Sequence, residues 1–157
     1  MCRILDIKEE RILKLTNIIE RKINDEESEL GIDVLVNQID NYIISKGAKC
    51  IGPLIHISEG KYDNDMEFRT ENTLMRQLDR VLHHPDKGYK FYPILKIKNC
   101  YYCRFSGEEG DIHFAVDKIR ILAYENYKTI KSKVYVVYIS NVDSKIVADI
   151  FVERVDE

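Results

Sequence analysis

Two amphipathic segments constrain the fold most, because each carries an apolar face at helical spacing and each is followed by two strand-like segments. In residues 28–46 apolar side chains recur every three or four positions, acidic residues crowd the start, and Gly47 stands where helices commonly end. Residues 111–128 repeat this spacing, with Asp111 as a suitable N-cap. Both segments are therefore predicted to be helices with one buried face: Ile32, Leu35, Val36, Ile39, Tyr42 and Ile43 in the first, and Ile112, Ala115, Val116, Ile119, Ala123 and Tyr127 in the second.

The segments on either side of these helices have the residue patterns of β-strands, rich in β-branched and aromatic residues and often alternating apolar with polar ones. Residues 50–58 are interrupted by Gly52-Pro53, which removes a backbone donor and predicts a bulge or an edge before the strand resumes. Residues 59–65 predict a turn that joins this strand to the next as a hairpin. The predicted strands are residues 11–21, 50–58, 66–70, 89–105, 133–142 and 145–155, the fourth ended by residues 107–110 and the last two joined by a tight turn at residues 141–144.

The predicted order is therefore strand, helix, strand, strand, and it occurs twice. Repeat one covers about residues 11–80 and repeat two about residues 89–155, within one domain of residues 1–157, a length typical of a single domain. A helix that leads into a hairpin suits an α+β fold, here a mostly antiparallel sheet with two helices on one face. A ferredoxin-like α+β sandwich is the alternative architecture.

This order resembles the GyrI-like effector-binding fold of bacterial transcription activators. The most specific match is the Gly-x-x-x-x-Gly-Pro element at Gly47, Gly52 and Pro53, followed by Leu-Ile. The strand Met66-Glu67-Phe68 and the hairpin strand Val136-Val137-Tyr138 give weaker support. A closer resemblance is to small stand-alone uncharacterised proteins of Gram-positive bacteria. The resemblance implies a ligand-sensing domain whose cavity lies between the sheet and the two helices.

Two departures from the family pattern alter the expected ligand. In members that bind cationic drugs, a glutamate two residues before the hairpin tyrosine faces the cavity, and the matching position here is Val136. The chain also contains 0 Trp, whereas members with hydrolytic activity are expected to need the acid and surrounding aromatic residues. The resemblance therefore implies a non-enzymatic protein without a cofactor, which binds an apolar or weakly polar small molecule.

Tyrosine is abundant, with 10 Tyr beside 5 Phe, and its apolar ring and hydroxyl suit pockets and interfaces. In the resembled fold the groove residues would come from the hairpin strands and the helix faces. His56 alternates with two isoleucines and faces away from them, either to solvent or into the groove. Filling of the core is the alternative role of the aromatic residues. The predicted ligand-binding residues are Tyr42, His56, Glu67, Phe68, Tyr102, Tyr127, Val136 and Tyr138.

Cysteine and histidine spacing offers two candidate metal or redox motifs. Cys100-Tyr-Tyr-Cys103 has the spacing of a zinc or redox pair, but on a strand these residues point to opposite faces about 10 Å apart, too far for a disulfide. His83-His84 precedes a proline in a polar segment and is predicted to be a solvated loop. No nucleophile elbow or phosphate-binding glycine loop occurs, so neither catalysis nor a metal site is expected.

Charge and hydropathy limit the partners. The chain carries 24 Lys and Arg against 27 Asp and Glu, a net charge of −3, which is the wrong sign for binding nucleic acid mainly through phosphates. Its longest apolar run, residues 134–139, is far shorter than the roughly 20 residues that span a membrane. No signal sequence is recognisable, and both ends lie close to the outermost predicted strands, so we expect a cytoplasmic protein with reduced cysteines and without a DNA-binding module. The alternative to a small-molecule partner is another protein, bound by an inhibitor or a secretion-associated adaptor.

Overall fold

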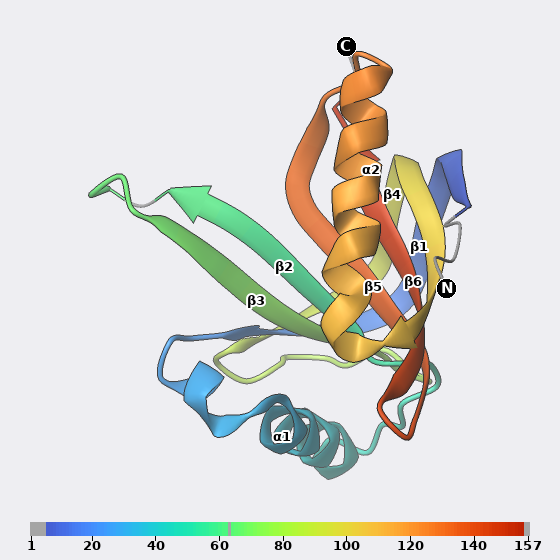
Figure 1. The fold of residues 1–157 in the computed structure, drawn as a ribbon. Helices are drawn as coiled ribbons and strands as arrows, with labels where there is room; N and C mark the ends of the chain where they lie inside the picture. Colours follow the sequence, from blue (N-terminus) through green and yellow to red (C-terminus); the bar gives the residue numbers. More distant parts are fainter. Residues whose placement is uncertain (1–5, 63, 156–157) are drawn as a thin grey trace. The chain divides into compact units, whose positions relative to one another are not determined.

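The computed structural model describes residues 6–62 and 64–155, which form two compact units. Unit 1 comprises the described residues of Met1–Leu13 and Lys96–Glu157, and unit 2 is Lys14–Leu95. The order of helices and strands is β1, α1, β2, β3, β4, α2, β5, β6 (Figure 1). The predicted α+β class with antiparallel strands is confirmed, while the single domain and the common face of both helices stay predictions.

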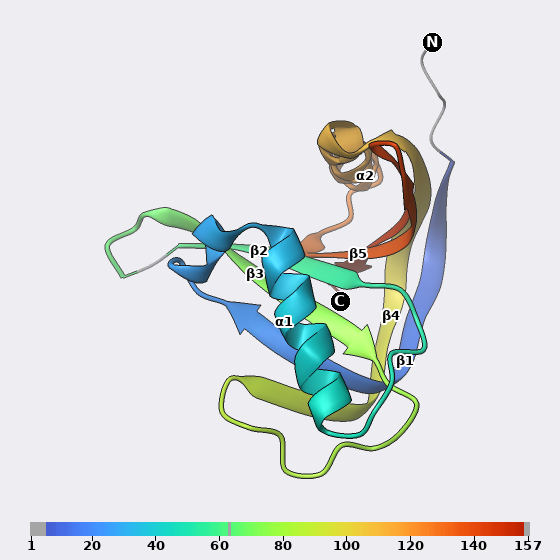
Figure 2. The ribbon, with the colours of Figure 1, turned by 90° about the horizontal axis from the view of Figure 1, so that it is seen from below.

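Unit 2 packs helix α1 (Ile32–Ser45) on a three-stranded antiparallel sheet. Strand β3 (Phe68–Gln77) is central and pairs with β1 (Ile7–Ile23) on one side and β2 (Ile55–Tyr62) on the other. Figure 2 shows α1 lying across these strands. The helix buries its predicted apolar face, and the core of the unit consists of Ile19, Leu35, Ile39, Ile43, Ala48, Leu74, Leu78 and Leu82.

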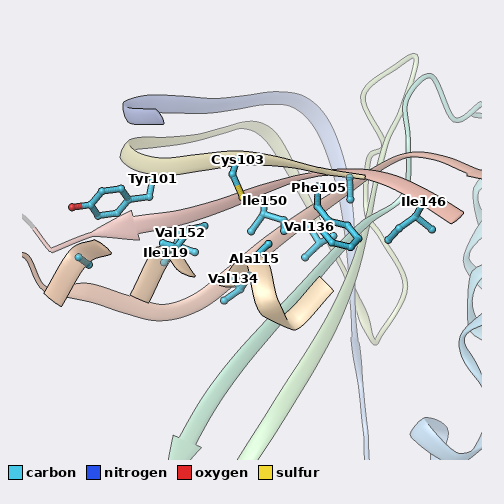
Figure 3. Packing of buried hydrophobic residues seen from close by; sticks show 12 residues of the cluster. Tyr101, Cys103, Phe105, Ala115, Ile119, Val134, Val136, Ile146, Ile150 and Val152 are labelled. Atoms are coloured by element: carbon cyan, nitrogen blue, oxygen red, sulfur yellow. The ribbon is translucent and has the colours of Figure 1, made fainter. Parts of the chain in front are cut away.

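Unit 1 packs helix α2 (Ile112–Glu125) on a second three-stranded antiparallel sheet. Strand β6 (Lys145–Arg154) is central and pairs with β4 (Tyr89–Glu108) and β5 (Ile130–Val142). Strands β1 and β4 each continue from one unit into the other. The core in Figure 3 consists of Tyr101, Cys103, Phe105, Ala115, Ile119, Ala123, Val134, Val136, Ile146, Ala148, Ile150 and Val152.

The hairpins account for most errors in the predicted strand limits. Residues 59–62 continue β2 instead of forming a turn, because they pair with residues 68–71 of β3, and the Phe68 ring lies over Gly60. Strand β3 continues to Gln77 and β4 to Glu108, beyond both predicted ends. The β5–β6 hairpin is confirmed, and its turn residues Asp143 and Ser144 have φ of 52° and 66°, as a two-residue turn of mirror-image type requires.

Helix α1 starts later, and helix α2 ends earlier, than predicted. Gly31, with φ of 86°, precedes α1, and the preceding Glu27–Leu30 forms a 3-10 turn, so the helix starts at Ile32. Asp111 occupies the predicted N-cap of α2, but within the described chain its side chain makes no capping hydrogen bond. Helix α2 ends at Glu125, three residues before the predicted end.

The two helices share one C-terminal geometry. The N–H of Ala48 donates to the carbonyl of Ile43 at 3.2 Å, and the N–H of Lys128 donates to the carbonyl of Ala123 at 2.8 Å. In both cases the residue before that donor is left-handed: Gly47 has φ of 80° and Tyr127 has φ of 55°. This arrangement satisfies carbonyls that lack helical partners and normally favours glycine at the left-handed position. Gly47 therefore ends α1 as predicted, whereas a tyrosine takes the same position after α2.

Candidate functional site

The predicted ligand-binding residues fall in both units. Unit 2 holds Tyr42, His56, Glu67 and Phe68, and unit 1 holds Tyr102, Tyr127, Val136 and Tyr138. Their joint role in one groove stays a prediction, and the surroundings of each are described below.

Tyr42 takes part in a tight cluster at the C-terminal end of α1. Its ring stacks on that of Tyr89 with centroids 3.7 Å apart and an interplanar angle of 8°. Its hydroxyl accepts a hydrogen bond of 2.8 Å from the backbone N–H of Asp86, and the Lys46 ammonium lies 5.6 Å from its ring centroid. Through these contacts Tyr42 connects α1 to the loop before β4.

A polar hollow of about 370 Å³ lies beside Tyr89, within unit 2. Arg21 donates to Gln38 at 2.8 Å and also to Glu27, and its guanidinium lies 5.9 Å from the Tyr89 ring centroid. Burial raises the pKa of the Tyr89 hydroxyl. The Arg21 charge meets a carboxylate and an amide, and Lys87 adds a second cation to the lining of the hollow. Its lining residues are Arg21, Asn24, Glu27, Gln38, Lys87, Gly88 and Tyr89.

The β2–β3 hairpin holds the other three predicted residues of unit 2. Phe68 pairs directly with Tyr62 in an edge-to-face contact of 5.5 Å, and 61% of its surface is exposed. Glu67 is exposed just before Phe68. The His56 Nε2 lies 3.0 Å from the Asn72 Oδ1. Cross-strand pairs of this kind stabilise a hairpin, and such a role explains the Tyr62–Phe68 contact.

A second hollow of about 350 Å³ beside the turn end of this hairpin is lined by charged groups of both signs. The Lys61 ammonium lies 3.1 Å from Glu59 and 3.2 Å from Glu71. The Arg69 guanidinium lies 3.5 Å from Asp25. These exposed pairs balance one another locally, and the hollow therefore lacks a strong field of either sign.

In unit 1, Tyr102 belongs to a hydrogen-bonded group that also contains Asp149 and Arg104. The Tyr102 hydroxyl donates to Asp149 Oδ1 at 2.8 Å, and Arg104 donates to both carboxylate oxygens at 2.8 and 3.1 Å. The Asp149 side chain is only 15% exposed. Burial and the hydrogen bond to Asp149 raise the pKa of Tyr102, so its hydroxyl stays protonated and donates at neutral pH.

These groups lie beside a row of aromatic residues that crosses the sheet of unit 1. Tyr102 pairs with Phe151 on the neighbouring strand, and Phe151 pairs in turn with Tyr135. The rings of Tyr102 and Phe151 lie 5.0 Å apart in a tilted arrangement. Because their neighbours along each strand point into the α2 core, these three side chains lie on the face of the sheet away from α2. We call Tyr102, Phe151 and Tyr135 the aromatic row.

Val136 and Tyr138 lie on the opposite face, which packs against α2. Val136 is buried in the core of unit 1, as Figure 3 shows, and Tyr138 packs against the edge of that core. Val134, Val136 and Tyr138 share this face of β5. Burial, and to a smaller extent Glu109, raise the pKa of Tyr138. A ligand-binding role for either residue stays a prediction.

The predicted position of Tyr127 on the buried helix face is wrong. Helix α2 ends before it, and its left-handed backbone turns the side chain outward, so that 95% of its surface is exposed. The sequence offers no glycine that would have indicated this end of the helix.

The Cys100–Cys103 motif lies in regular strand, with both thiols free and buried. Cys103 points into the α2 core, whereas Cys100 pairs with Glu153 on the other face of the sheet. Burial raises the pKa of each thiol to about 11, so both are protonated and poorly nucleophilic near neutral pH. Among the residues that the structure describes, no group of three His, Cys, Asp or Glu side chains could hold a metal ion. No helix in residues 6–62 and 64–155 has the length and apolarity to cross a membrane.

Solved structures resemble the chain over nearly its whole length. A protein solved as a hydrolase from Listeria innocua gives a TM-score of 0.58 at 12% identity, covering 96% of this chain and 91% of its own. An uncharacterised conserved protein from Listeria innocua gives 0.58 at 14% identity, covering 94% and 92%. EcmrR, solved in a complex with DNA, gives 0.63 at 10% identity, covering 95% of this chain and 58% of EcmrR. The chain has the GyrI-like fold. No protein-family model and no curated protein matches the sequence.

Within this GyrI-like fold, sequence reasoning missed Asp149, Arg104 and Phe151. One signal was available: Asp149 is the only charged residue in the otherwise apolar stretch of residues 146–152. Such a residue on a strand needs a partner when it is largely buried. Its partner could not be found from the sequence, because Arg104 lies 45 positions away and meets it only through the pairing of β4 with β6.

Proposed function

We propose that this protein is a non-enzymatic binding protein for an apolar or weakly polar small molecule. The GyrI-like fold supports ligand binding in general, because the family resemblance of the sequence implies a ligand-sensing domain. The aromatic row of unit 1, with a charge-balanced carboxylate beside it, supports the preferred ligand chemistry.

The ligand preference follows from the hydrogen bonds of Asp149. A cation is attracted to a buried carboxylate whose charge lacks a partner. Here Arg104 already binds both oxygens of Asp149, and Tyr102 donates to one of them. In the aromatic row Tyr135 is buried and Tyr102 and Phe151 are half-buried, so the accessible surface is mainly the edges of these two rings, which suits a neutral or weakly polar aromatic molecule.

A binding role without catalysis agrees with the chemistry of the cysteines. The raised pKa values of Cys100 and Cys103 make both thiols unsuited to nucleophilic attack near pH 7. The Listeria innocua protein solved as a hydrolase is 12% identical, a similarity that supports a common fold alone.

A thermal-shift screen with matched ligands tests this proposal. It compares neutral aromatic compounds, cationic compounds of the same shape and lipophilic acids, since a ligand at 100 times its Kd adds about 2.7 kcal/mol of stability. We expect neutral compounds to stabilise the protein more than their cationic counterparts. A screen without any stabilising compound, or one in which only cations stabilise, would contradict the proposal.

Two matched variants locate the binding surface. Phe151→Leu removes a ring from the aromatic row and should weaken binding about tenfold, which corresponds to about 1.4 kcal/mol. Phe68→Leu removes a ring from the β2–β3 hairpin of unit 2 and should leave the affinity unchanged. The reverse result in isothermal titration would assign binding to the hairpin.

A protein-interaction module is the second candidate function, and the exposed end of the β2–β3 hairpin favours it. Tyr62, Met66 and Phe68 are 70%, 77% and 61% exposed there. Exposed apolar groups gathered at one place commonly mark binding surfaces. A protein captured from bacterial cytoplasm by the wild type, but not by a Tyr62→Ser/Phe68→Ser variant, would favour this function over the first. The cytoplasmic location that such an experiment assumes is itself a prediction.

A further inference from the structure

The amide and carboxylate oxygens that line the hollow beside Tyr89 are already engaged within unit 2. The Gln38 Oε1 accepts a hydrogen bond of 2.8 Å from Arg21. The Asn24 Oδ1 accepts one of 2.7 Å from the backbone N–H of Glu27. The two carboxylate oxygens of Glu27 accept from Arg21 and from the backbone N–H of Asn24. These side chains therefore leave few acceptors for a ligand.

The hydrogen-bond donors of the same lining remain available. Each amide nitrogen of Gln38 and Asn24 carries two N–H bonds, and within the described part of the chain neither nitrogen donates to a protein acceptor. Burial raises the pKa of the Tyr89 hydroxyl, which therefore stays protonated at neutral pH and can donate as well. The hollow thus offers more donors than acceptors.

The lining also carries one positive charge in excess. The guanidinium of Arg21, whose side chain is 13% exposed, and the carboxylate of Glu27 neutralise each other. Among the residues that the structure describes, no carboxylate forms an ion pair with the ammonium of Lys87, which also lines the hollow. The neighbouring Asp86 pairs with Lys46 at 3.1 Å instead. Lys87 therefore supplies the surplus charge.

We propose that this hollow is a binding site for a small organic monocarboxylate. A carboxylate presents only acceptors and carries one negative charge, so it matches both the available donors and the single surplus cation. The Lys87 ammonium meets its charge, and the amides of Gln38 and Asn24 donate to its oxygens. A volume of about 370 Å³ lies in the range of small-molecule sites and leaves room for a body attached to the carboxylate.

Two other classes of ligand match the hollow less well. A phosphate monoester carries about −1.5 to −2 charges at pH 7, more than one surplus cation offsets. A cationic ligand would meet the Lys87 charge without an available acceptor. The hollow also differs from the aromatic row of unit 1, for which we propose a neutral or weakly polar ligand, so binding at one surface should not depend on the other.

NMR titration of the full chain with butanoate tests the proposal. Butanoate should shift the side-chain amide signals of Gln38 and Asn24, with a dissociation constant on the order of 1 mM. Butanamide has the same shape without the charge and should bind at least about tenfold more weakly. Inorganic phosphate, which carries more charge, should also bind more weakly than butanoate.

Three variants test the contacts one by one. Lys87→Gln should weaken butanoate binding about threefold to fivefold, the range of a partly exposed ion pair. Lys90→Gln makes the same change of charge at an exposed lysine outside the lining and should leave the affinity unchanged. Gln38→Glu keeps an acceptor for Arg21 but replaces the amide donors with a negative charge, and should abolish binding. Circular dichroism and thermal unfolding verify that each variant is folded.

Several results would overturn the monocarboxylate site. Butanamide or phosphate might bind as tightly as butanoate, or the Gln38 and Asn24 amide signals stay unmoved. Equal weakening by both lysine variants would mean that butanoate only gathers near surface lysines. Phe151→Leu, which removes a ring from the aromatic row, should leave butanoate binding unchanged, and a loss of affinity in this variant would assign the carboxylate to unit 1.

Discussion

The two units build their cores by different means. In unit 2 the helix supplies large core side chains, because Leu35, Ile39 and Ile43 fill the space above the sheet. In unit 1 the equivalent helix positions are Ala115, Ile119 and Ala123, and the sheet supplies large side chains such as Tyr101 and Phe105 instead. Small residues on a helix allow its backbone to approach the sheet closely, and large ones then fill the remaining space from the strands. A helix packed on antiparallel strands is thus compatible with two complementary distributions of side-chain volume.

The largest expected effect concerns Val136, which lies in the core of unit 1. Val136→Glu places a carboxylate among apolar side chains, where an uncompensated charge costs roughly 3–5 kcal/mol. Val142→Glu, on the same strand with 65% exposure, should change the free energy of unfolding by no more than about 0.5 kcal/mol. Urea unfolding measures both. A Val136→Glu variant as stable as the control would mean that this side chain reaches solvent or a groove.

The same variant tests whether the units unfold together. Strands β1 and β4 each continue through both units, so destabilising unit 1 should also destabilise unit 2. Hydrogen exchange of the α1 amides in Val136→Glu reports on unit 2 separately. Unchanged protection of α1 would contradict the predicted single domain.

The second effect is alkaline destabilisation through the two buried thiols of unit 1. Burial raises the pKa of Cys100 and Cys103 to about 11, whereas an unfolded cysteine has a pKa of about 8.5. Below about pH 8.5 both states keep the proton, so these thiols add no pH dependence. As pH rises above this value, the unfolded chain loses protons that the folded one retains, and stability falls by up to about 1.4 kcal/mol per pH unit for each thiol.

Urea midpoints between pH 8 and pH 10 measure this decline, before most tyrosines ionise. A Cys100→Ala/Cys103→Ala variant starts from lower stability but should show a flatter pH profile. Cys50→Ser is the matched control in unit 2, and because Cys50 is exposed it should change the profile less. Equal slopes in all three proteins would show that the thiols are accessible in the folded state.

The third expected change in stability concerns the C-terminal ends of the two helices. Tyr127 holds a left-handed conformation that costs an ordinary residue about 1–2 kcal/mol and glycine almost nothing. With 95% of its surface exposed, it offers little packing in return. Tyr127→Gly should therefore stabilise the protein by about 1 kcal/mol, and Gly47→Ala should destabilise it by a similar amount.

Thermal and urea unfolding measure this pair of opposite changes. Gly110→Ala is a suitable control, because its backbone is not left-handed and an added Cβ meets open space. A destabilised Tyr127→Gly variant would indicate that the tyrosine ring has a contact that outweighs its backbone strain.

The sequence predicted elements well where a local pattern determines them. Both helices were predicted from apolar spacing, and the β5–β6 hairpin from its β-branched strands and short turn. The end of α1 was also predictable, since Gly47 marks it, whereas Tyr127 gives no such signal at the end of α2. The continuation of β2 through Gly60 was missed because a glycine among polar residues normally indicates a turn. Only the paired strand, which brings Phe68 over that glycine, makes the strand continue.

The candidate site was less predictable, because it depends on contacts between distant residues. Tyr102 was recognised from its residue type, but the group that holds it comes from the pairing of β4 with β6. Tyr42 was assigned to ligand binding, and its stacking partner Tyr89 lies 47 positions away in the sequence. Residue types identify groups able to bind a ligand, while the register of the strands decides which groups already have partners.

The smallest expected change in stability concerns two bidentate ion pairs, one in each unit. Arg76 binds both oxygens of Asp40 at 3.1 Å and joins β3 to α1, whereas Arg104 binds Asp149 and joins β4 to β6. The Arg76 side chain is 16% exposed and that of Arg104 is 57% exposed. Lysine keeps the charge but cannot reproduce the two-pronged contact, and the loss matters more where water is excluded. Arg76→Lys should therefore lower stability by about 1 kcal/mol, and Arg104→Lys by less.

Urea unfolding of both variants, with Asp40→Asn and Asp149→Asn to complete two double-mutant cycles, measures each coupling. A stronger coupling for Arg104 than for Arg76 would mean that the burial of Asp149, and not that of the arginine, determines the strength of the pair.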